Sequence, residues 1–170
     1  MDAARRIEAA GADTLLVCTN TMHKLAEEIE AAIGIPLLHI ADATGQSILA
    51  MNAKKIGLLG TAFTMEQDFY KGRLRDKFGL EVSVPQAEDR KIIHRIIYQE
   101  LCLGKVLPES RAEFMRIVEG MESEGVEAVV LGCTEIGMLL KPIDVNIPLL
   151  DTMKIHARQA VAFALLRPWL

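Results

Sequence analysis

A repeated segment constrains the fold of this chain more than any other feature of its sequence. Residues Gly11–Asn20 align without gaps on Gly125–Thr134, and each copy reads glycine, an acidic residue, an apolar run and a small polar turn. Ile35–His39 then matches Ile147–Asp151 after a difference of two residues in spacing. Two unrelated buried βα units would also share apolar runs, but the matched Ile-Pro-Leu-Leu element extends the likeness beyond hydrophobicity. The repeat predicts two similar lobes that face each other about a pseudo-two-fold axis.

Short apolar runs bounded by Gly, Pro or Asn alternate with segments of helical period. This alternation is typical of βα units and a parallel sheet, so the predicted class is α/β. The expected strands are Thr14–Cys18, Leu37–Ile40, Lys55–Gly60, Glu81–Val84, Ala128–Gly132 and Pro148–Leu150. The expected helices, after one that begins at Met1, are His23–Ile33, Ala43–Met51, Met65–Lys77, Asp89–Leu103, Glu109–Glu124 and Thr152–Leu166.

The predicted lobes divide at a short connection, because no linker or low-complexity segment interrupts the chain. With 170 residues and 51% hydrophobic content, the chain can form one sizeable core or two small lobes that share one. We expect an N-terminal lobe over residues 1–53, a C-terminal lobe over 54–151, and a helix over 152–170 that packs back on the first lobe. The first lobe has fewer predicted strands than the second. By symmetry, a leading βαβ segment comparable to Lys55–Leu103 is missing from its front.

Charge and cysteine usage limit the possible partners. The net charge is −4 and no block of Lys or Arg occurs, which argues against a nucleic-acid or anionic-membrane partner and leaves a small polar ligand. The sequence contains no apolar run of transmembrane length. Three widely spaced cysteines without an export signal predict reduced thiols in the cytoplasm. Neither a P-loop nor a Gly-x-Gly-x-x-Gly motif is found, so no nucleotide cofactor is expected.

The two matched turns carry the side chains that suit proton transfer. In open parallel sheets, ligands bind beyond the carboxyl ends of the strands, where Thr19 and Cys133 stand. We expect a helix N-terminus to lower the pKa of Cys133 from about 8.5 toward about 7, which requires roughly 2 kcal/mol. Two proton-handling groups that face each other across a cleft suit racemisation or epimerisation. The enolate-like charge would be stabilised by backbone N–H groups and by Asn20, Thr21 and Thr134.

The segments Cys18-Thr-Asn-Thr-Met-His23 and Gly132-Cys-Thr-Glu135 resemble the two signature motifs of the aspartate/glutamate racemase family, especially its broad-specificity or L-aspartate/glutamate-specific members. The match in order and spacing covers essentially the whole chain. The resemblance implies two α/β lobes with the active site between them, a small amino-acid substrate, no pyridoxal phosphate or metal, and a homodimer. It also implies that one Cys from each motif transfers protons, which carries over directly to Cys133.

The first motif departs from the family pattern. The family commonly places Cys directly before Asn-Thr, whereas this chain has Thr19 there and Cys18 one residue earlier. The repeat pairs Thr19 with Cys133, and adjacent strand residues point to opposite faces, so Thr19 is favoured in the site with Cys18 as the alternative. Since a hydroxyl is a far poorer base than a thiolate, we expect an asymmetric racemase that starts from one enantiomer much better than from the other.

Two further motif residues have both a functional and a structural interpretation. His23 follows Thr19 by four residues and could polarise its hydroxyl, as the family's His implies, or simply cap a helix. Glu135 could bind the substrate amine or orient Thr134, but an acid in a first helical turn also complements the helix dipole.

A third turn offers groups to a carboxylate. Gly60-Thr-Ala-Phe-Thr64 ends a strand and opens a helix, so its N–H groups and the hydroxyls of Thr61 and Thr64 could bind an anion, or serve only as caps. Cys102 stands where some members of the resembled family carry a Lys that contacts the side-chain carboxylate of the substrate. Selectivity for acidic substrates must then come from elsewhere.

Three functions therefore compete. The motif pair favours a cofactor-independent racemase of aspartate, glutamate or a similar amino acid. A related reaction, such as that of a hydantoin racemase, a maleate isomerase or a decarboxylase of malonate-like acids, would use the same thiol. The missing leading segment favours an inactive remnant that keeps the fold.

Overall fold

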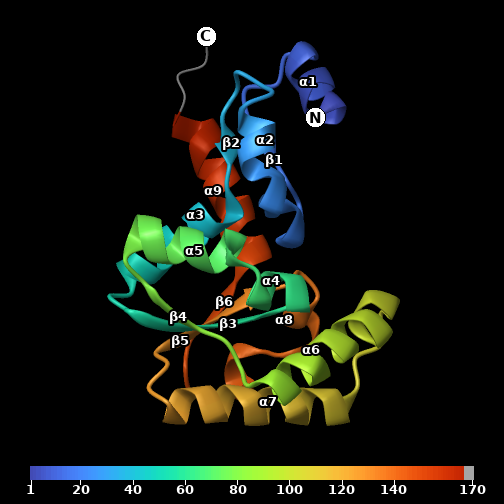
Figure 1. Cartoon of the computed structure of the whole chain (residues 1–170), viewed down its shortest axis with the longest axis vertical. Helices are drawn as coiled ribbons and strands as arrows, with labels where there is room; N and C mark the ends of the chain where they lie inside the picture. The colour runs from blue at the N-terminus through green and yellow to red at the C-terminus, as the bar shows by residue number, and fades with distance from the viewer. Residues whose placement is uncertain (167–170) are drawn as a thin grey trace.

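The computed structural model describes residues 1–166, in which helices alternate with parallel strands. Within this range the strands form two sheets, with the orders β1-β2 and β4-β3-β5-β6, so the predicted α/β class is confirmed (Figure 1). The strands are β1 (Leu15–Leu16), β2 (Leu37–Leu38), β3 (Lys55–Gly60), β4 (Glu81–Ser83), β5 (Ala128–Gly132) and β6 (Leu149–Asp151). The helices are α1 (Asp2–Ala9), α2 (Ala26–Glu30), α3 (Ile40–Ala50), α4 (Ala62–Glu66), α5 (Asp68–Phe78), α6 (Ala87–Gln99), α7 (Pro108–Ser123), α8 (Ile136–Leu139) and α9 (Thr152–Leu166), with 3-10 turns η1 (Thr21–Leu25), η2 (Leu101–Leu103) and η3 (Pro142–Asp144).

Both copies of the repeat form the same strand pair in the same register. Leu15 lies opposite Leu37 in the first sheet, and their repeat equivalents Val129 and Leu149 lie opposite each other in the second. The glycine that opens each copy ends a helix with a positive φ, 88° at Gly11 and 86° at Gly125. Only glycine adopts this conformation without strain, so the repeat preserves the turn as well as the strand.

Some predicted helices differ from the observed ones at their ends. The helix expected over Met65–Lys77 is divided into α4 and α5, because Gln67 has extended backbone angles of φ −77° and ψ 156°. Helix α3 begins at Ile40, three residues before the expected start. Its N-cap is His39, whose ring nitrogen accepts a hydrogen bond from the backbone N–H of Ala41. The sequence pattern did not indicate this cap, because histidine is not among the preferred N-cap residues.

Helices α3 and α9 join the two lobes. Ile40 and Ile48 of α3, a helix that follows the first sheet, pack in a buried cluster with Ile56 and Val130 of the second sheet. Conversely, α9 follows the second sheet but contacts α3 and β2, and the His156 ring donates to the Leu38 carbonyl at 2.6 Å. A helix that follows each sheet thus packs against the other sheet, and Figure 1 shows α9 beside β2.

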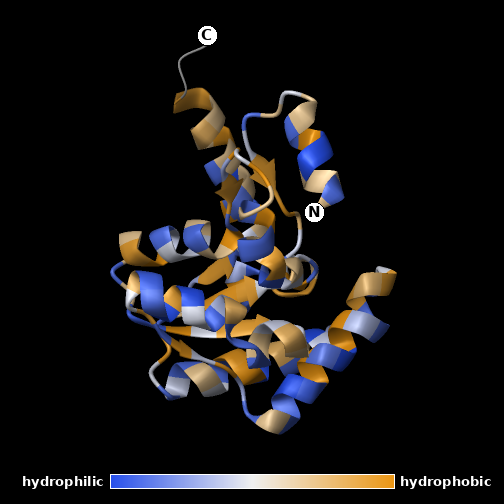
Figure 2. Cartoon of the chain, turned by 45° about the horizontal axis from the view of Figure 1, so that its top comes forward, coloured by the Kyte–Doolittle hydropathy of each residue, from blue (hydrophilic) through white to orange (hydrophobic). Residues whose placement is uncertain are grey.

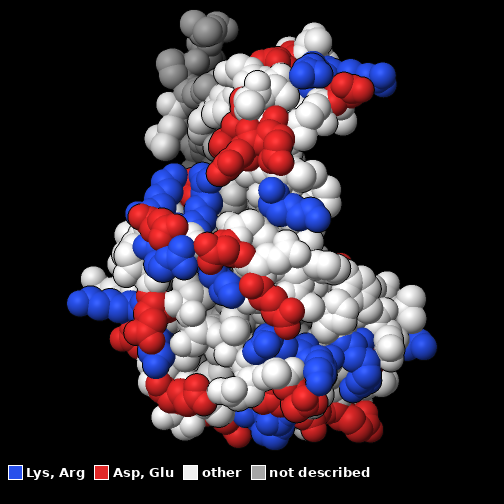
Figure 3. Space-filling model, viewed as in Figure 1, with Lys and Arg blue, Asp and Glu red and all other residues white. Residues whose placement is uncertain are grey.

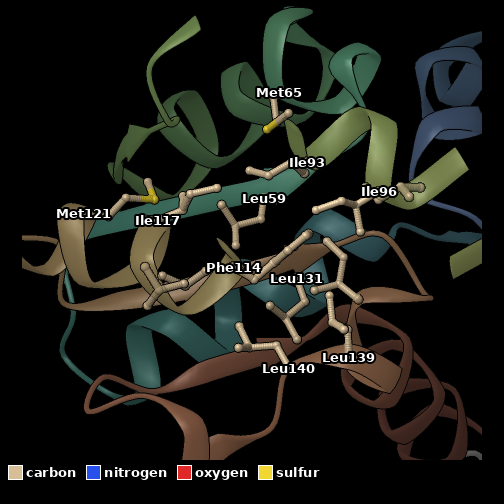
Figure 4. Packing of buried hydrophobic residues seen from close by; sticks show 14 of the residues in the cluster. Leu59, Met65, Ile93, Ile96, Phe114, Ile117, Met121, Leu131, Leu139 and Leu140 are labelled. Carbon is tan, nitrogen blue, oxygen red and sulfur yellow. The ribbon is translucent and has the colours of Figure 1, made fainter. Parts of the chain in front are cut away.

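Helix α3 packs on one face of the four-stranded sheet, and α6 and α7 cover the other face. In Figure 4, Phe114 and Ile117 of α7 lie against Leu59 of β3 and Leu131 of β5, in a cluster whose members are almost fully buried. Figure 2 shows that the strands are mainly hydrophobic, whereas the helices carry both hydrophilic and hydrophobic residues. This packing fixes the ends of β3 and β5, from which the turns of the candidate site emerge.

The surface carries charges of both signs. Lys and Arg side chains are interspersed with Asp and Glu on the face shown in Figure 3, without a field of a single sign. None of the helices within residues 1–166 combines the length and apolar character needed to cross a bilayer.

Candidate active site

A cavity of about 400 Å³ lies between the lobes, and we call it the interlobe cavity. Its walls come from the turn after β1, the turn after β5, the start of α4 and the end of α6. It brings together most of the residues predicted from the sequence, namely Cys18, Thr19, Asn20, Thr21, Thr61, Cys133, Thr134 and Glu135. A separate cavity of about 330 Å³, with Lys141, Lys154 and Arg158 in its lining, contains none of these residues.

Cys133 directly follows β5 and is half-buried in the wall of the interlobe cavity. Its Sγ donates a hydrogen bond to Glu135 Oε2 at 2.9 Å. Burial raises the pKa of the Cys133 thiol, and the adjacent carboxylate raises it further. The expected lowering by a helix N-terminus is therefore wrong for this structure. Helix α8 has only four residues, and the negative Glu135 carboxylate lies 2.9 Å from the sulfur.

Glu135 is the acceptor of two hydrogen bonds in this turn. Its Oε2 accepts from the Cys133 thiol and, at 2.7 Å, from the Thr134 hydroxyl. Burial alone would raise the pKa of Glu135, but these two donors outweigh it and hold the pKa below its usual value. The side chain is thus ionised at neutral pH. It can orient Thr134, as one interpretation of the sequence expected, and it accepts the hydrogen bond of the thiol.

Thr19 and Cys18 both line the interlobe cavity. Strand β1 ends at Leu16, and the Thr19 N–H already donates to the Val17 carbonyl at 2.8 Å in a tight turn. Because the strand has ended, the alternation of side chains no longer separates the two residues, and the alternation argument for Thr19 alone does not apply. The pairing of Thr19 with Cys133 by the repeat remains the reason to prefer it.

Asn20 is 3% exposed and links the two lobes. Its Nδ2 donates to Thr152 Oγ1 at 3.1 Å, and the Thr152 hydroxyl donates to the Leu131 carbonyl at 2.8 Å. Among residues 1–166, the Asn20 Oδ1 atom has no hydrogen-bond partner. A buried acceptor without a donor is costly, so this atom is an unsatisfied polar group at the boundary between the lobes.

Three threonine hydroxyls form a triangle beside these turns. Thr21 Oγ1 lies 3.4 Å from Thr61 Oγ1 and 3.3 Å from Thr64 Oγ1, and the last two are 3.3 Å apart. Thr61 is the N-cap residue of α4, but its side chain makes no capping hydrogen bond, so capping does not account for its hydroxyl. Thr64 is fully buried behind the other two. We call this group the hydroxyl triangle; its protons can be directed at a carboxylate.

Gly60 and Gly132, the first residues of two segments named in the sequence, allow this arrangement. A Cβ atom on Gly60 would lie 3.0 Å from the Gly132 carbonyl oxygen, and one on Gly132 would lie 2.9 Å from the Leu59 carbonyl oxygen. A Cβ atom would be crowded at Gly60 and would force a shift at Gly132, because the ends of β3 and β5 approach closely. This approach brings the turn that carries Thr61 next to the turn that carries Cys133.

His23 lies behind the first turn rather than in the cavity lining. Its Nε2 accepts from the Ile40 N–H at 3.2 Å, so its Nδ1 carries the proton and donates to the Thr19 carbonyl at 2.8 Å. Both ring nitrogens are therefore occupied by the main chain and neither faces the Thr19 hydroxyl. Burial lowers the pKa of His23 to about 4, so the ring is neutral at physiological pH. Its observed role is to hold the turn.

Some cavity residues were not indicated by the sequence pattern. Lys24, Phe63 and Tyr98 line the interlobe cavity. Lys24 directly follows the first motif and Phe63 lies inside the Gly60–Thr64 turn, so their position in the sequence could have predicted that they line the site. No group of His, Cys, Asp and Glu side chains within residues 1–166 has the geometry to hold a metal ion.

Together these residues make a site in which a thiol and an ionised carboxylate line the same cavity as a second polar turn, between two α/β lobes.

The family model described as Asp/Glu/Hydantoin racemase matches residues 1–160. A candidate Asp/Glu racemase from Yersinia pestis is 51% identical with a TM-score of 0.92, over 96% of this chain and 71% of that one. An aspartate racemase homologue from Pyrococcus horikoshii OT3 is 36% identical with a TM-score of 0.87, over 96% and 71% of the two chains. The broad specificity amino-acid racemase of Bacillus subtilis (strain 168) is 24% identical over 169 residues, which are 95% of this chain and 69% of that relative.

The chain therefore belongs to the Asp/Glu/hydantoin racemase family, and its function is that of an amino-acid racemase, an isomerase. The family predicted from the two motifs is confirmed. The comparisons do not favour the alternative functions over amino-acid racemisation.

Proposed function

We propose that the chain interconverts the L and D forms of aspartate, glutamate or a similar amino acid in the interlobe cavity, without pyridoxal phosphate or a metal. The observation that carries the proposal is the hydrogen bond from the Cys133 thiol to the ionised Glu135 carboxylate, opposite the turn of Thr19. A proton-transfer group on each side of one cavity is what inversion at a carbon requires. One side removes the α-proton, and the other returns a proton to the opposite face.

Substrate binding is proposed to use the groups that have spare hydrogen-bonding capacity. The α-carboxylate would accept hydrogen bonds from Thr21 and Thr61 of the hydroxyl triangle, which Thr64 supports from behind. The α-ammonium would donate to the unpartnered Oδ1 of Asn20 and approach Glu135. As the α-proton leaves, charge moves onto the carboxylate, where donors fixed in advance stabilise it most.

Cys133 acts in both directions of the proposed reaction. As an acid, its S–H delivers a proton to the planar intermediate. As a base, it first passes its own proton to Glu135 Oε2, which already accepts its hydrogen bond, and then removes the α-proton as a thiolate. The positive charge of the bound ammonium lowers the pKa of a neighbouring thiol and so favours this second step.

The opposite face is assigned to Thr19, with Cys18 as the alternative. A hydroxyl is a much weaker base than a thiolate, so the enzyme should start from one enantiomer far better than from the other. Initial rates from the L and D forms, measured before and after Cys18→Ala, test this assignment. Equal rates that the substitution abolishes would assign the role to Cys18 instead.

The function itself is tested by hydrogen exchange. The purified chain, freed of metal and added cofactor, is incubated with L-aspartate or L-glutamate in D₂O. We expect exchange of the α-proton and formation of the D-isomer, both lost in Cys133→Ala. A well-folded chain that exchanges neither substrate would contradict the proposal.

We also propose that the enzyme is a homodimer that acts in the cytoplasm. Its three cysteines are free thiols, as a reducing compartment would keep them. The homodimer is what the resemblance of the two motifs to the family implies. Light scattering coupled to size-exclusion chromatography would measure the mass, and a monomer at micromolar concentration would contradict the dimer.

A further inference from the structure

The interlobe cavity has one charged side chain of each sign in its lining, as far as residues 1–166 define it: Lys24 and Glu135. The Glu135 carboxylate is engaged by Cys133 and Thr134. The Lys24 ammonium, in contrast, makes no hydrogen bond or ion pair with any of the described residues. Many other lysines are paired, as Lys77 is with Asp42 at 2.6 Å.

The backbone at Lys24 is held in place although its side chain is free. His23, the preceding residue, is anchored by the Thr19 carbonyl on one side and the Ile40 N–H on the other. The lysine stem therefore starts from a fixed point at the cavity wall, while its ammonium can move to meet a ligand. An exposed lysine with no partner inside the protein loses little on binding an anion, because it breaks no existing ion pair.

We propose that Lys24 is a specificity-determining residue that binds the distal carboxylate of an acidic amino acid. The inference rests on the proposed function, in which the hydroxyl triangle and Asn20 take the groups on the α-carbon. The distal group then remains to be recognised. Cys102, which lines the same cavity, cannot supply a positive charge, because a thiol is either neutral or anionic.

The charges in the interlobe cavity also favour a cation beside the distal carboxylate of the substrate. An acidic amino acid brings a net charge of minus one into a cavity that already contains ionised Glu135. Without Lys24 the cavity would repel such a substrate, whereas a neutral amino acid would meet no such penalty. Lys24 balances Glu135, so it should affect acidic substrates and leave their amides almost unchanged.

Calorimetric titration of L-aspartate and its uncharged analogue L-asparagine tests the inference. We expect the wild-type chain to bind aspartate more tightly, and Lys24→Met to weaken aspartate binding about tenfold, as loss of one charged hydrogen bond does. Asparagine binding should change by less than about twofold. The control is Lys54→Met, the same substitution at an exposed lysine beside the opposite end of β3 from the cavity.

The outcomes separate this inference from the proposed function. Equal weakening of aspartate and asparagine would assign Lys24 a structural role and overturn the inference. An unchanged aspartate affinity in Lys24→Met, or a wild-type chain without preference for aspartate, would also overturn it. Selective loss of aspartate binding in a chain that shows no exchange in D₂O would uphold Lys24 and refute the racemase proposal instead.

Discussion

The Cys133 thiol donates its hydrogen bond to Glu135, two residues further along the chain, and the same carboxylate oxygen holds the Thr134 hydroxyl. Reactive cysteines usually lie next to positive charge, which favours the thiolate. Here the neighbour is negative and favours the protonated thiol. The free site therefore holds its sulfur in the protonated form.

Replacement of Glu135 by Gln should separate thiol reactivity from catalysis. Without the carboxylate charge the pKa of Cys133 should fall, so alkylation by iodoacetamide at pH 8 should become several-fold faster. Racemisation should become slower, because the thiol proton has lost its acceptor. Peptide-resolved mass spectrometry would follow Cys133 apart from the more exposed Cys18 and Cys102. An unchanged rate of alkylation at Cys133 would show that the carboxylate does not control it.

The histidines between the lobes should make stability depend on pH. The His23 and His39 ring centroids are 4.5 Å apart, and burial lowers their pKa values to about 4 and about 3. In the unfolded chain both titrate near 6.5, so below that pH the unfolded state binds more protons than the folded state. The free energy of unfolding should fall between pH 8 and 5 by about 2 kcal/mol for each ring.

Urea denaturation at several pH values would measure this loss. His39→Asn keeps a good N-cap for α3 and should flatten the pH profile, because one of the two rings is gone. A wild-type chain equally stable at pH 8 and 5 would refute the prediction.

Gly132 should be intolerant of any side chain. In Gly132→Ala the new Cβ would lie 2.9 Å from the Leu59 carbonyl oxygen and from the Leu58 side chain, at the joint that aligns two site turns. We expect a loss of roughly 1–3 kcal/mol in the free energy of unfolding, with slower exchange in D₂O. Gly120→Ala on α7 meets no atom within 4 Å and should instead stabilise the chain slightly. Similar changes in the free energy of unfolding for the two substitutions would mean that the ends of β3 and β5 can move apart to accept the new methyl group.

The two copies of the repeat pair their strands in the same register because register depends on local pattern and turn geometry, both of which the copies share. The helix over 152–170 was expected to pack back on the first lobe, but nothing in the sequence indicated that α3 packs on the second sheet, since that depends on which apolar faces meet in three dimensions. The division into lobes at residues 53 and 151 accordingly stays a prediction. The direction of the pKa shift at Cys133 was also missed, because the length of the following helix and the burial of the sulfur depend on the folded structure. The helix has only four residues, and burial raises the pKa of the thiol.

Thr152 provides a final test, because a residue outside both motifs connects the lobes at the site. Its hydroxyl accepts from Asn20 Nδ2 and donates to the Leu131 carbonyl, two residues before Cys133. Thr152→Val has the same shape but leaves Asn20 and Leu131 without this partner, which should cost about 1–3 kcal/mol in stability. If the hydroxyl positions Asn20 for the substrate ammonium, KM should rise, whereas Thr152→Ser should restore both stability and KM. Normal KM in a destabilised Thr152→Val chain would limit Thr152 to joining the lobes.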